Sequence, residues 1–528
     1  MSDGLSQVTE DSARGGFFLF SGAALASIIL AVSAILMGRL LGPNLYGEYN
    51  LVLVIPSLLL LFTDLGVNAG VTKFAASLRV EGKSDRIPKI ISNGLIFRLA
   101  VGVIVSILSL VFAGYFALLI NRPTYTFLIQ LASLSVIFQV VFTTSNSAFV
   151  GLDKSEYSAL ATTTRAVLTT ILQVTLVVFS FSLTGALIGF VGGFVIASLL
   201  GGAILFFKFL RPVHDSKVLG SVNQSGRQVL TLLARYGMPV YVSVVLVGFF
   251  PLYQQLILSF FSSNAAIGNF RAAYNFVSLL SIISASITTA LLPAFSKLEF
   301  AKPEVVSAFF NKANKYTCLV IVPITVVAII FSGPIVKLLY GSGYTSAPLF
   351  LSLNCAVYLL CVIGSLTLQS VFNGLGKTRL TMNVALINFV LLLVLSPILA
   401  IFYNVVGVIV ASIISTVVAS IYAAVVATRQ LKIKFSFKIP FRIYLISLLS
   451  AFPALILVLF TSLDFAVTFL FGAVAYLFVF ATLMPIMKII NKQELEALAR
   501  VSGKLPLVKV AGKLLFSYQQ KILFSING

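Results

Sequence analysis

Long uninterrupted runs of hydrophobic residues alternate along the chain with short stretches that are polar or contain glycine and proline. A run of roughly 20 apolar residues is long enough for a helix to cross a bilayer. Membrane barrel strands would alternate apolar and polar positions, whereas these runs are continuous. The pattern predicts about fourteen transmembrane helices, at residues 17–38, 46–72, 90–119, 124–150, 156–180, 184–207, 229–258, 265–292, 308–331, 346–372, 380–402, 404–427, 441–461 and 465–488.

The composition agrees with this pattern. Hydrophobic residues make up 59% of the 528 residues and charged residues 10%, with a mean hydropathy of +1.08. A soluble domain would be about 45–50% apolar and about one quarter charged. The first apolar run is too long for the core of a signal peptide, so we expect it to remain as a helix. The sequence therefore predicts an all-α polytopic membrane protein.

The net charge of +21 raises the alternative of a nucleic-acid-binding protein. Most of the 36 Lys and Arg residues, however, fall in the loops on the same side of the predicted helices as the N-terminus. The opposite loops contain only Arg39, Arg122 and Lys337. Such a bias is typical of cytoplasmic loops. We therefore expect a multi-pass protein of the cell membrane with both termini in the cytoplasm, and no nucleic-acid partner.

The sequence also contains an internal repeat. Residues 147–154 (SAFVGLDK) match residues 370–377 (SVFNGLGK), and two further sets match at nearly the same spacing. The spacing covers six predicted helices, an even number, so the two copies have the same orientation. Parallel repeats of this kind are typical of transporters that hold substrate between two lobes; the alternative is an inert duplicated bundle. The further matched residues are Phe181 and Gly185 with Tyr403 and Gly407, and Gly47, Tyr49 and Phe74 with Gly268, Phe270 and Phe295.

The repeat divides the chain into five expected regions. Residues 1–210 form an N-terminal six-helix lobe, and residues 211–228 form a cytoplasmic loop between the lobes. Residues 229–430 form the second lobe, and residues 431–490 two additional helices. Residues 491–528 form a basic cytoplasmic tail, which either lies on the membrane as an amphipathic helix or is solvated.

The residue inventory excludes several kinds of chemistry. The one histidine, His214, lies in the predicted loop between the lobes, and Cys318, Cys355 and Cys361 have no C-x-x-C spacing. No P-loop or dinucleotide-binding motif is present. We therefore expect no cofactor, no metal site and no enzymatic activity.

Four arginines lie within the predicted helices: Arg98, Arg165, Arg235 and Arg271. A charged residue at the centre of a membrane helix costs roughly 2.5–3.5 kcal/mol, so such residues usually face a wet cavity or reach the interface. Guanidinium groups match the oxygens of phosphate groups in bidentate geometry. These residues are therefore candidates for binding an anionic headgroup; the alternative is that some extend to lipid headgroups.

Only Asp64 and Glu48 are acids at a comparable depth. Either is a candidate for coupling transport to H+ or Na+. For Asp64 the alternatives are capping a helix or pairing with a neighbouring base, and Glu48, closer to the outer edge, is the weaker candidate.

The seventh predicted helix is interrupted by glycine and proline. Proline removes a backbone hydrogen bond and permits bending. These residues are a candidate hinge for alternating access, or else they produce a static kink: Gly237, Pro239, Gly248 and Pro251.

Five segments resemble one known family. Residues 38–49 read GRLLGPNLYGEY, and residues 62–66 and 71–75 read FTDLG and VTKFA. Residues 291–297 (LLPAFSK) and 372–378 (FNGLGKT) are similar to the same family. This family is the polysaccharide transporter family, the Wzx-type flippases of lipid-linked oligosaccharides, within the multidrug/oligosaccharidyl-lipid/polysaccharide exporter superfamily. The resemblance covers most of the chain up to about residue 430.

The resemblance implies a V-shaped, two-lobed helical fold. It also implies movement of a glycan linked to a polyprenyl or dolichyl (pyro)phosphate from the inner to the outer leaflet, with membrane lipids and H+ or Na+ as further partners. In relatives, cationic cavity residues are thought to hold the headgroup, which agrees with the four arginines. One alternative is a cation-coupled multidrug exporter of the same superfamily, which would need an acidic cavity. A more distant alternative is a membrane glycosyl- or acyltransferase, which would need more acids or histidines within the membrane.

Overall fold

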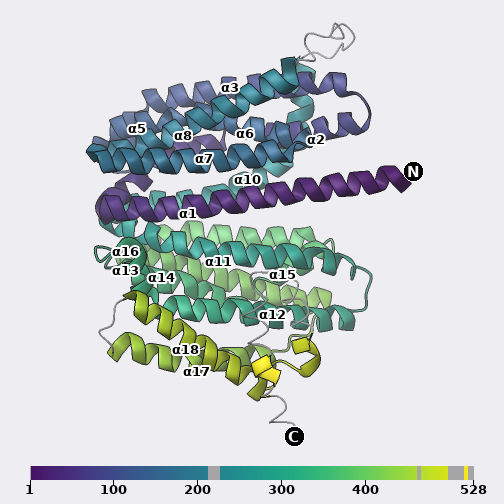
Figure 1. Cartoon of the computed structure of the whole chain (residues 1–528), viewed down its shortest axis with the longest axis vertical. Coiled ribbons are helices and arrows are strands. Elements are labelled where there is room, and N and C mark those ends of the chain that lie inside the picture. Colours follow the sequence, from purple (N-terminus) through teal and green to yellow (C-terminus); the bar gives the residue numbers. More distant parts are fainter. Residues whose placement is uncertain (1, 212–225, 461–464, 497–516, 521, 523–528) are drawn as a thin grey trace. The chain divides into compact units, whose positions relative to one another are not determined.

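A computed structural model describes residues 2–211, 226–460, 465–496, 517–520 and 522. Apart from short turns, these residues are helical, and no strand occurs among them (Figure 1). His214 and most of the basic tail lie outside the described residues.

The helices follow one another through short connections. In the first half they are α1 (Ser2–Leu61), α2 (Val67–Val80), η1 (Ser84–Arg86), α3 (Ile87–Val111), α4 (Ala113–Leu119), η2 (Pro123–Tyr125), α5 (Thr126–Ser133), α6 (Ser135–Gly151), α7 (Ser155–Leu176), η3 (Val177–Phe181), α8 (Ser182–Ile204), η4 (Leu205–Leu210) and α10 (Gly226–Phe261). In the second half they are α11 (Asn264–Ser296), α12 (Pro303–Ile330), α13 (Ser332–Tyr340), α14 (Ala347–Ala356), η6 (Val357–Ile363), α15 (Leu368–Gly374), α16 (Thr378–Leu431), α17 (Lys438–Phe460) and α18 (Phe465–Ile486).

Ten helical segments of the described chain are long and apolar enough to cross a membrane, or eleven if one bent pair is a single crossing. Three of the ten are too long for one crossing, because a straight helix of 54 residues such as α16 would measure about 80 Å, against a hydrocarbon core of about 30 Å. Each contains a break with positive φ: Gly42 in α1, Ser180 and Ser182 between α7 and α8, and Asn404 in α16. These breaks lie where the sequence predicts adjacent crossings to meet, and the total of fourteen remains a prediction.

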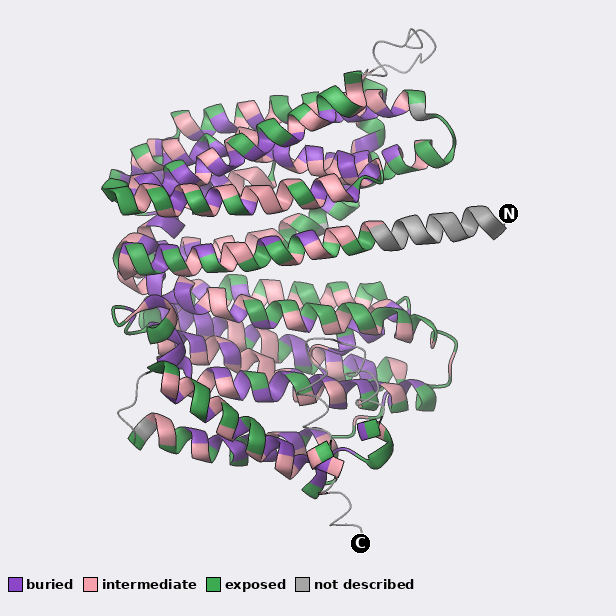
Figure 2. Ribbon diagram, in the orientation of Figure 1, coloured by how far each residue is buried: buried purple, intermediate pink, exposed green. Residues whose placement is uncertain are grey.

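Exposed residues recur along the helices (Figure 2), and many of them are large and apolar. Phe441, Leu448 and Phe452 on α17, for example, are each more than 60% exposed. A soluble protein rarely exposes so continuous an apolar surface. This surface is suited to lipid, and the expected all-α polytopic membrane fold is confirmed.

Backbone contacts divide the chain into two compact units, Met1–Arg271 and Ala272–Gly528. The first unit includes α10, which packs against α1, α2 and α3. The sequence places α10 in the second lobe, so the boundary between the units lies farther along the chain than the predicted loop at 211–228. The predicted lobes themselves remain a prediction.

The repeat has a counterpart in the packing of each unit. A methyl group on Gly151 would lie 2.9 Å from the carbonyl oxygen of Thr72 in α2. A methyl group on its repeat equivalent Gly374 would lie 3.1 Å from the carbonyl oxygen of Leu292 in α11. Phe149 and Phe372, which are also equivalent, each lie in the hydrophobic core beside these contacts. Equivalent glycine and phenylalanine residues therefore pack against a neighbouring helix in each copy of the repeat.

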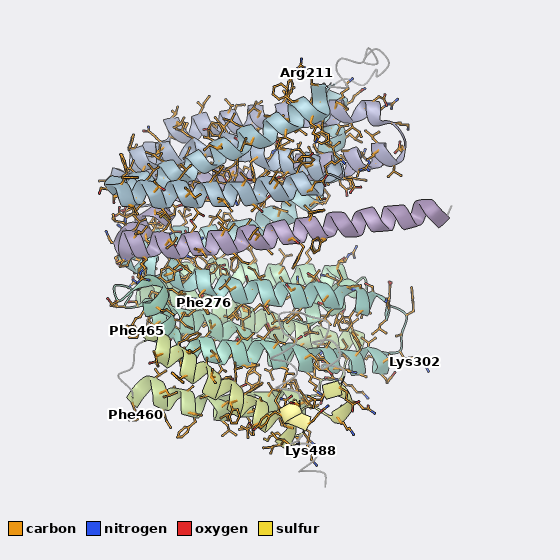
Figure 3. All side chains as sticks on the ribbon, in the orientation of Figure 1. Arg211, Phe276, Lys302, Phe460, Phe465 and Lys488 are labelled. Atoms are coloured by element: carbon orange, nitrogen blue, oxygen red, sulfur yellow. The ribbon has the colours of Figure 1, made fainter. Side chains whose placement is uncertain are left out.

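Figure 3 shows Phe460 and Phe465 at one end of the helices of the second unit and Lys302 and Lys488 at the other. The Nζ atom of Lys337 lies 4.7 Å from the centre of the Phe465 ring, so basic residues occur at both ends. The orientation of the chain in the membrane remains a prediction.

Candidate functional site

All four predicted membrane arginines belong to the first unit. They lie 7 to 11 residues from the start of α3, α7, α10 or α11, or about 10–17 Å along the helix axis. Their surroundings differ, and this decides what each side chain can do.

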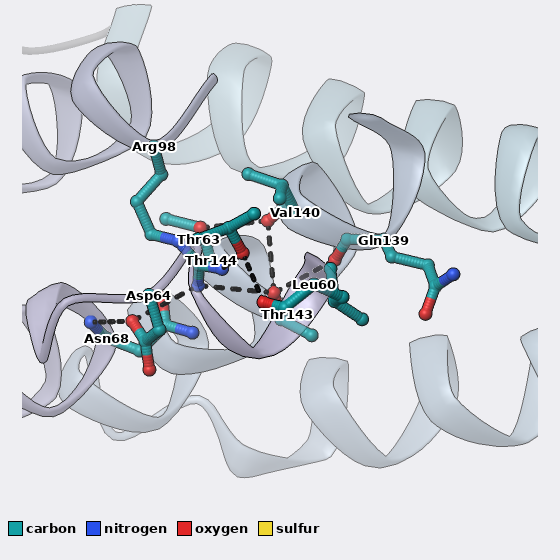
Figure 4. Close-up of polar contacts among 9 residues, drawn as sticks. All are labelled: Leu60, Thr63, Asp64, Asn68, Arg98, Gln139, Val140, Thr143 and Thr144. Atoms are coloured by element: carbon teal, nitrogen blue, oxygen red, sulfur yellow. Dashed lines mark hydrogen bonds and ion pairs between the residues drawn. The ribbon is translucent and has the colours of Figure 1, made fainter. Parts of the chain in front are cut away.

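Arg98 forms an ion pair with Asp64 (Figure 4), and the distance from Nη1 to Oδ1 is 3.3 Å. Its Nη2 donates to Thr63 Oγ1 at 3.0 Å and its Nη1 to Thr143 Oγ1 at 3.4 Å. Arg98 is only 2% exposed, so it does not extend to the surface. These contacts join α3, α6 and the connection after α1.

Asp64 lies in the break between α1 and α2, where Leu65 and Gly66 both have positive φ. Its Oδ1 also accepts a hydrogen bond of 3.0 Å from the backbone N–H of Asn68 in the first turn of α2. Of the roles considered from sequence, capping and pairing with a base are thus both present. The sequence contained no signal that Arg98, 34 positions away, would be the partner.

Arg165 of α7 lies among aromatic rings. Its guanidinium carbon is 4.9 Å from the centre of the Phe194 ring and 5.5 Å from that of Phe142. The two rings are themselves in edge-to-face contact. Within the described part of the chain no carboxylate pairs with Arg165, and its Nε is buried without a hydrogen-bond partner. Arg165 is therefore a half-buried cation with unused hydrogen-bonding capacity.

Arg235 is exposed on α10. The next residue, Tyr236, has the Nζ atom of Lys73 3.8 Å from its ring centre and packs edge-on against Phe74. A second positive charge, that of Lys73, is thus held on the neighbouring side chain. No ion pair involves Arg235 among the residues that the structure describes.

Arg271 lies near a buried polar network. Its charge acts on Tyr49 of α1, whose hydroxyl accepts a hydrogen bond of 2.6 Å from Gln173 Nε2. Gln173 Oε1 in turn accepts from Ser33 at 3.3 Å. Helices α1 and α7 therefore present aligned polar groups close to the start of α11.

Glu48 lies six residues after the Gly42 break in α1, in a network not anticipated from sequence. Its Oε1 accepts from Asn264 Nδ2 at 3.1 Å and from Asn44 Nδ2 at 3.2 Å. Arg122, expected in an exposed loop, donates from Nε to Asn264 Oδ1 at 3.0 Å and from Nη2 to the Ser262 carbonyl at 3.0 Å. The carboxylate of Glu48 is thereby held by amide donors.

The candidate hinge residues lie in α10, which is one continuous helix with Pro239 and Pro251 inside it. A methyl group on Gly237 would lie 1.8 Å from the carbonyl oxygen of Gly66. One on Gly248 would lie 2.9 Å from the Leu61 side chain. Close helix approach accounts for both glycines, and a hinge at these positions remains a prediction.

One basic residue within a predicted helix has a buried partner. Lys315, in the predicted helix 308–331, lies inside α12 and is buried. Its Nζ contacts both carboxylate oxygens of Glu494 at 2.7 Å. The periodicity of the apolar run could not show that a segment following α18 folds back to cover this position.

No cluster of three or more His, Cys, Asp or Glu residues suited to a metal ion occurs among the described residues.

A family model for polysaccharide biosynthesis proteins matches residues 12–299. The chain belongs to this family. A search of curated protein sequences found no match.

Solved structures with the same fold are membrane transporters. The lipid II flippase MurJ in an inward closed conformation has a TM-score of 0.68 at 18% identity, covering 89% of this chain and 99% of MurJ. An inward-facing multidrug resistance MATE family transporter of the MOP superfamily has a TM-score of 0.62 at 16% identity, with coverage of 77% and 94%. A point mutant of the Vibrio cholerae MATE transporter VcmN has a TM-score of 0.54 at 16% identity, with coverage of 81% and 98%. The expected resemblance is confirmed, and the family member has a transporter fold and not that of a membrane transferase.

Proposed function

We propose that this chain moves a polyprenyl- or dolichyl-(pyro)phosphate-linked oligosaccharide from the cytoplasmic to the outer leaflet by alternating access. The lipid tail stays in the bilayer while the headgroup passes through the protein. Membership of a polysaccharide biosynthesis family and the MurJ fold support a substrate of this class.

The observation that carries the proposal is the charge balance of the first unit at membrane depth. Asp64 is engaged by Arg98, and Glu48 by two amides. Arg165 and Arg235 have no carboxylate partner in the described chain. A half-buried cation such as Arg165 needs compensation, and a phosphate oxygen supplies it.

The pairing divides the four arginines into two roles. We assign Arg165, Arg235 and Arg271 to the headgroup. Arg98 is assigned a positioning role, because Asp64, Thr63 and Thr143 already contact both of its Nη atoms and the side chain is buried. Release of Asp64 from Arg98 on binding H+ would provide coupling to an ion gradient.

The proposal is tested with purified protein in proteoliposomes containing a fluorescent polyprenyl pyrophosphate glycan. Arg165→Gln, Arg235→Ala and Arg271→Ala should each slow movement between leaflets at least about tenfold, and in cells the lipid-linked glycan should accumulate in the inner leaflet. Arg79→Gln is the matched control, since Arg79 pairs with Asp153 on the surface with about 40% of each side chain exposed. Normal export by all three variants would contradict the headgroup assignment.

The multidrug exporter is the second candidate, because two of the similar structures are MATE transporters. A cationic drug needs an available carboxylate, and Asp64 is paired. Resistance to cationic drugs conferred on a sensitive host, and lost in Asp64→Asn, would favour this candidate instead. Repeating both assays with and without H+ and Na+ gradients tests coupling.

A further inference from the structure

The second unit contains an open cavity of about 360 Å³ lined by residues of η6, α15 and the two halves of α16. Its volume lies within the range of roughly 300–1,000 Å³ found for small-molecule sites. Asn388 is ten residues from the start of α16, or about 15 Å along the helix, so the cavity lies well inside the membrane-spanning region.

Polar side chains with unused hydrogen-bonding capacity line this cavity. The Oδ1 atom of Asn388 is buried and has no hydrogen-bond partner. Within the described residues no hydrogen bond is formed by the side chains of four further lining residues: Ser365, Gln369, Thr416 and Ser420. An unsatisfied polar group at membrane depth costs several kcal/mol, so a ligand or water must supply the partners.

The lining combines apolar and polar side chains and contains no charged one. Helix α16 has no Asp, Glu, Lys or Arg between Arg379 and Arg429, and η6 and α15 contain none. Asn and Gln amides both donate and accept hydrogen bonds, as do Ser and Thr hydroxyls. The rings of Tyr358 and Phe372 add apolar faces to the same lining. Mixed donors and acceptors beside aromatic faces suit a neutral, hydroxyl-rich ligand.

We infer that this cavity binds a sugar residue of the transported glycan. The inference rests on the proposed function and assigns sugar recognition to neutral groups within the second unit. A bare Na+ ion is a poorer occupant, because the cavity contains no carboxylate and is far larger than the ion.

The test compares binding of two kinds of lipid to the purified full-length protein: a polyprenyl pyrophosphate bearing one hexose or N-acetylhexosamine, and the same lipid without a sugar. Wild-type protein should bind the better of the sugar-bearing lipids about tenfold more tightly than the sugar-free lipid, as two or three net hydrogen bonds would provide. Asn388→Leu and Ser420→Ala should lose most of this preference and keep their affinity for the sugar-free lipid.

Ser396→Ala is the matched control, because Ser396 is also a buried serine of α16 without a hydrogen-bond partner but does not line the cavity. Ala385→Phe fills the cavity from an exposed position and provides a second variant if Asn388→Leu does not fold.

The outcomes separate the two proposals. Equal wild-type affinity for all the lipids, or an unchanged sugar preference in Asn388→Leu and Ala385→Phe, would overturn the sugar site and leave the flippase proposal standing. Variants that change only the response to Na+ would assign the cavity to an ion and also overturn the sugar site. Failure of the wild type to bind any of these lipids would overturn the flippase proposal and the sugar site with it.

Discussion

Gly47 and Gly268 pack against each other reciprocally within the first unit. A methyl group on Gly47 would lie 1.8 Å from the carbonyl oxygen of Asn264, and one on Gly268 would lie 1.9 Å from that of Pro43. Gly47 and Gly268 are equivalent positions of the internal repeat. Pro43 and Asn264, whose carbonyl oxygens the methyl groups would meet, are equivalent to each other as well. This symmetric contact allows the backbones of α1 and α11 to approach closely, as small residues do between membrane helices.

A larger side chain at this contact should separate the helices. We expect Gly268→Val to lower the free energy of unfolding by about 1–3 kcal/mol, the usual cost of overpacking, measured by thermal unfolding in detergent. Gly333→Val is the control, since a methyl group there would meet nothing within 4 Å. Equal melting temperatures for the two variants would show that the glycine contact is not needed for stability.

Replacing Asp64 and replacing Arg98 should lower the free energy of unfolding by different amounts, although the two residues form one ion pair. The Arg98 side chain is 3% exposed and that of Asp64 28%. Asp64→Asn leaves a buried cation without its counter-charge, and such a change typically lowers the free energy of unfolding by about 3–5 kcal/mol. Arg98→Gln should cost less, because the remaining carboxylate can be hydrated. Melting temperatures of both single variants and the double variant provide the measurement, and a larger loss for Arg98→Gln would contradict this account.

Arg165 should not tolerate lysine. The planar guanidinium lies over the rings of Phe142 and Phe194, whereas an ammonium group lacks a planar face for packing on aromatic rings and cannot bind phosphate through two parallel bonds. We expect Arg165→Lys to weaken binding of the polyprenyl pyrophosphate glycan by about 2- to 30-fold. Arg79→Lys, at the surface, is the control and should bind this lipid as the wild type does. Unchanged binding by Arg165→Lys would show that only the positive charge at this position matters.

The Lys315–Glu494 pair predicts a loss of stability in acid. Burial raises the pKa of Glu494, but hydrogen bonds from Lys315, the Asn491 backbone and Tyr316 outweigh it and hold the pKa below its usual value. A depressed pKa stabilises the folded state fully above the unfolded pKa of about 4.3. That stability is lost as the pH falls through the lower folded value.

Melting temperatures measured from pH 7 down to pH 3 should therefore fall more steeply below about pH 4.3 for the wild type than for Glu494→Gln. At pH 7 the variant should melt at a lower temperature, since Lys315 is buried and loses its counter-charge. If the melting temperatures of the two proteins change with pH in parallel across this range, the pair does not contribute to the pH dependence of stability.

Much of the fold could be predicted because the bilayer imposes strong local rules. Apolar runs and loop charges depend on each residue's own transfer energy, so the helical class, the repeat and the four membrane arginines were visible in the sequence. The equivalence of Gly151 with Gly374, found as a string match, reappears as equivalent packing in each unit.

Which side chains contact the buried cations could not be predicted in the same way. Arg98 and Arg165 look alike in the sequence, each about ten residues into an apolar helix, yet one meets Asp64 and the other two phenylalanines. The break after α1, with positive φ at Leu65 and Gly66, directs Asp64 to Arg98. Lys315 likewise became a buried residue only because Glu494 returns to α12 after the last two helices, α17 and α18.

The sequence alone therefore determined that this is an all-α membrane protein with an internal repeat and an excess of intramembrane cations, because those properties follow from composition and periodicity. Only the tertiary structure decided which cations are neutralised and where unpaired polar groups gather, as at Asn388 in the second unit. Charge compensation and hydrogen bonding act over a few ångströms between side chains, and residues far apart in the chain reach those distances only once the helices have packed.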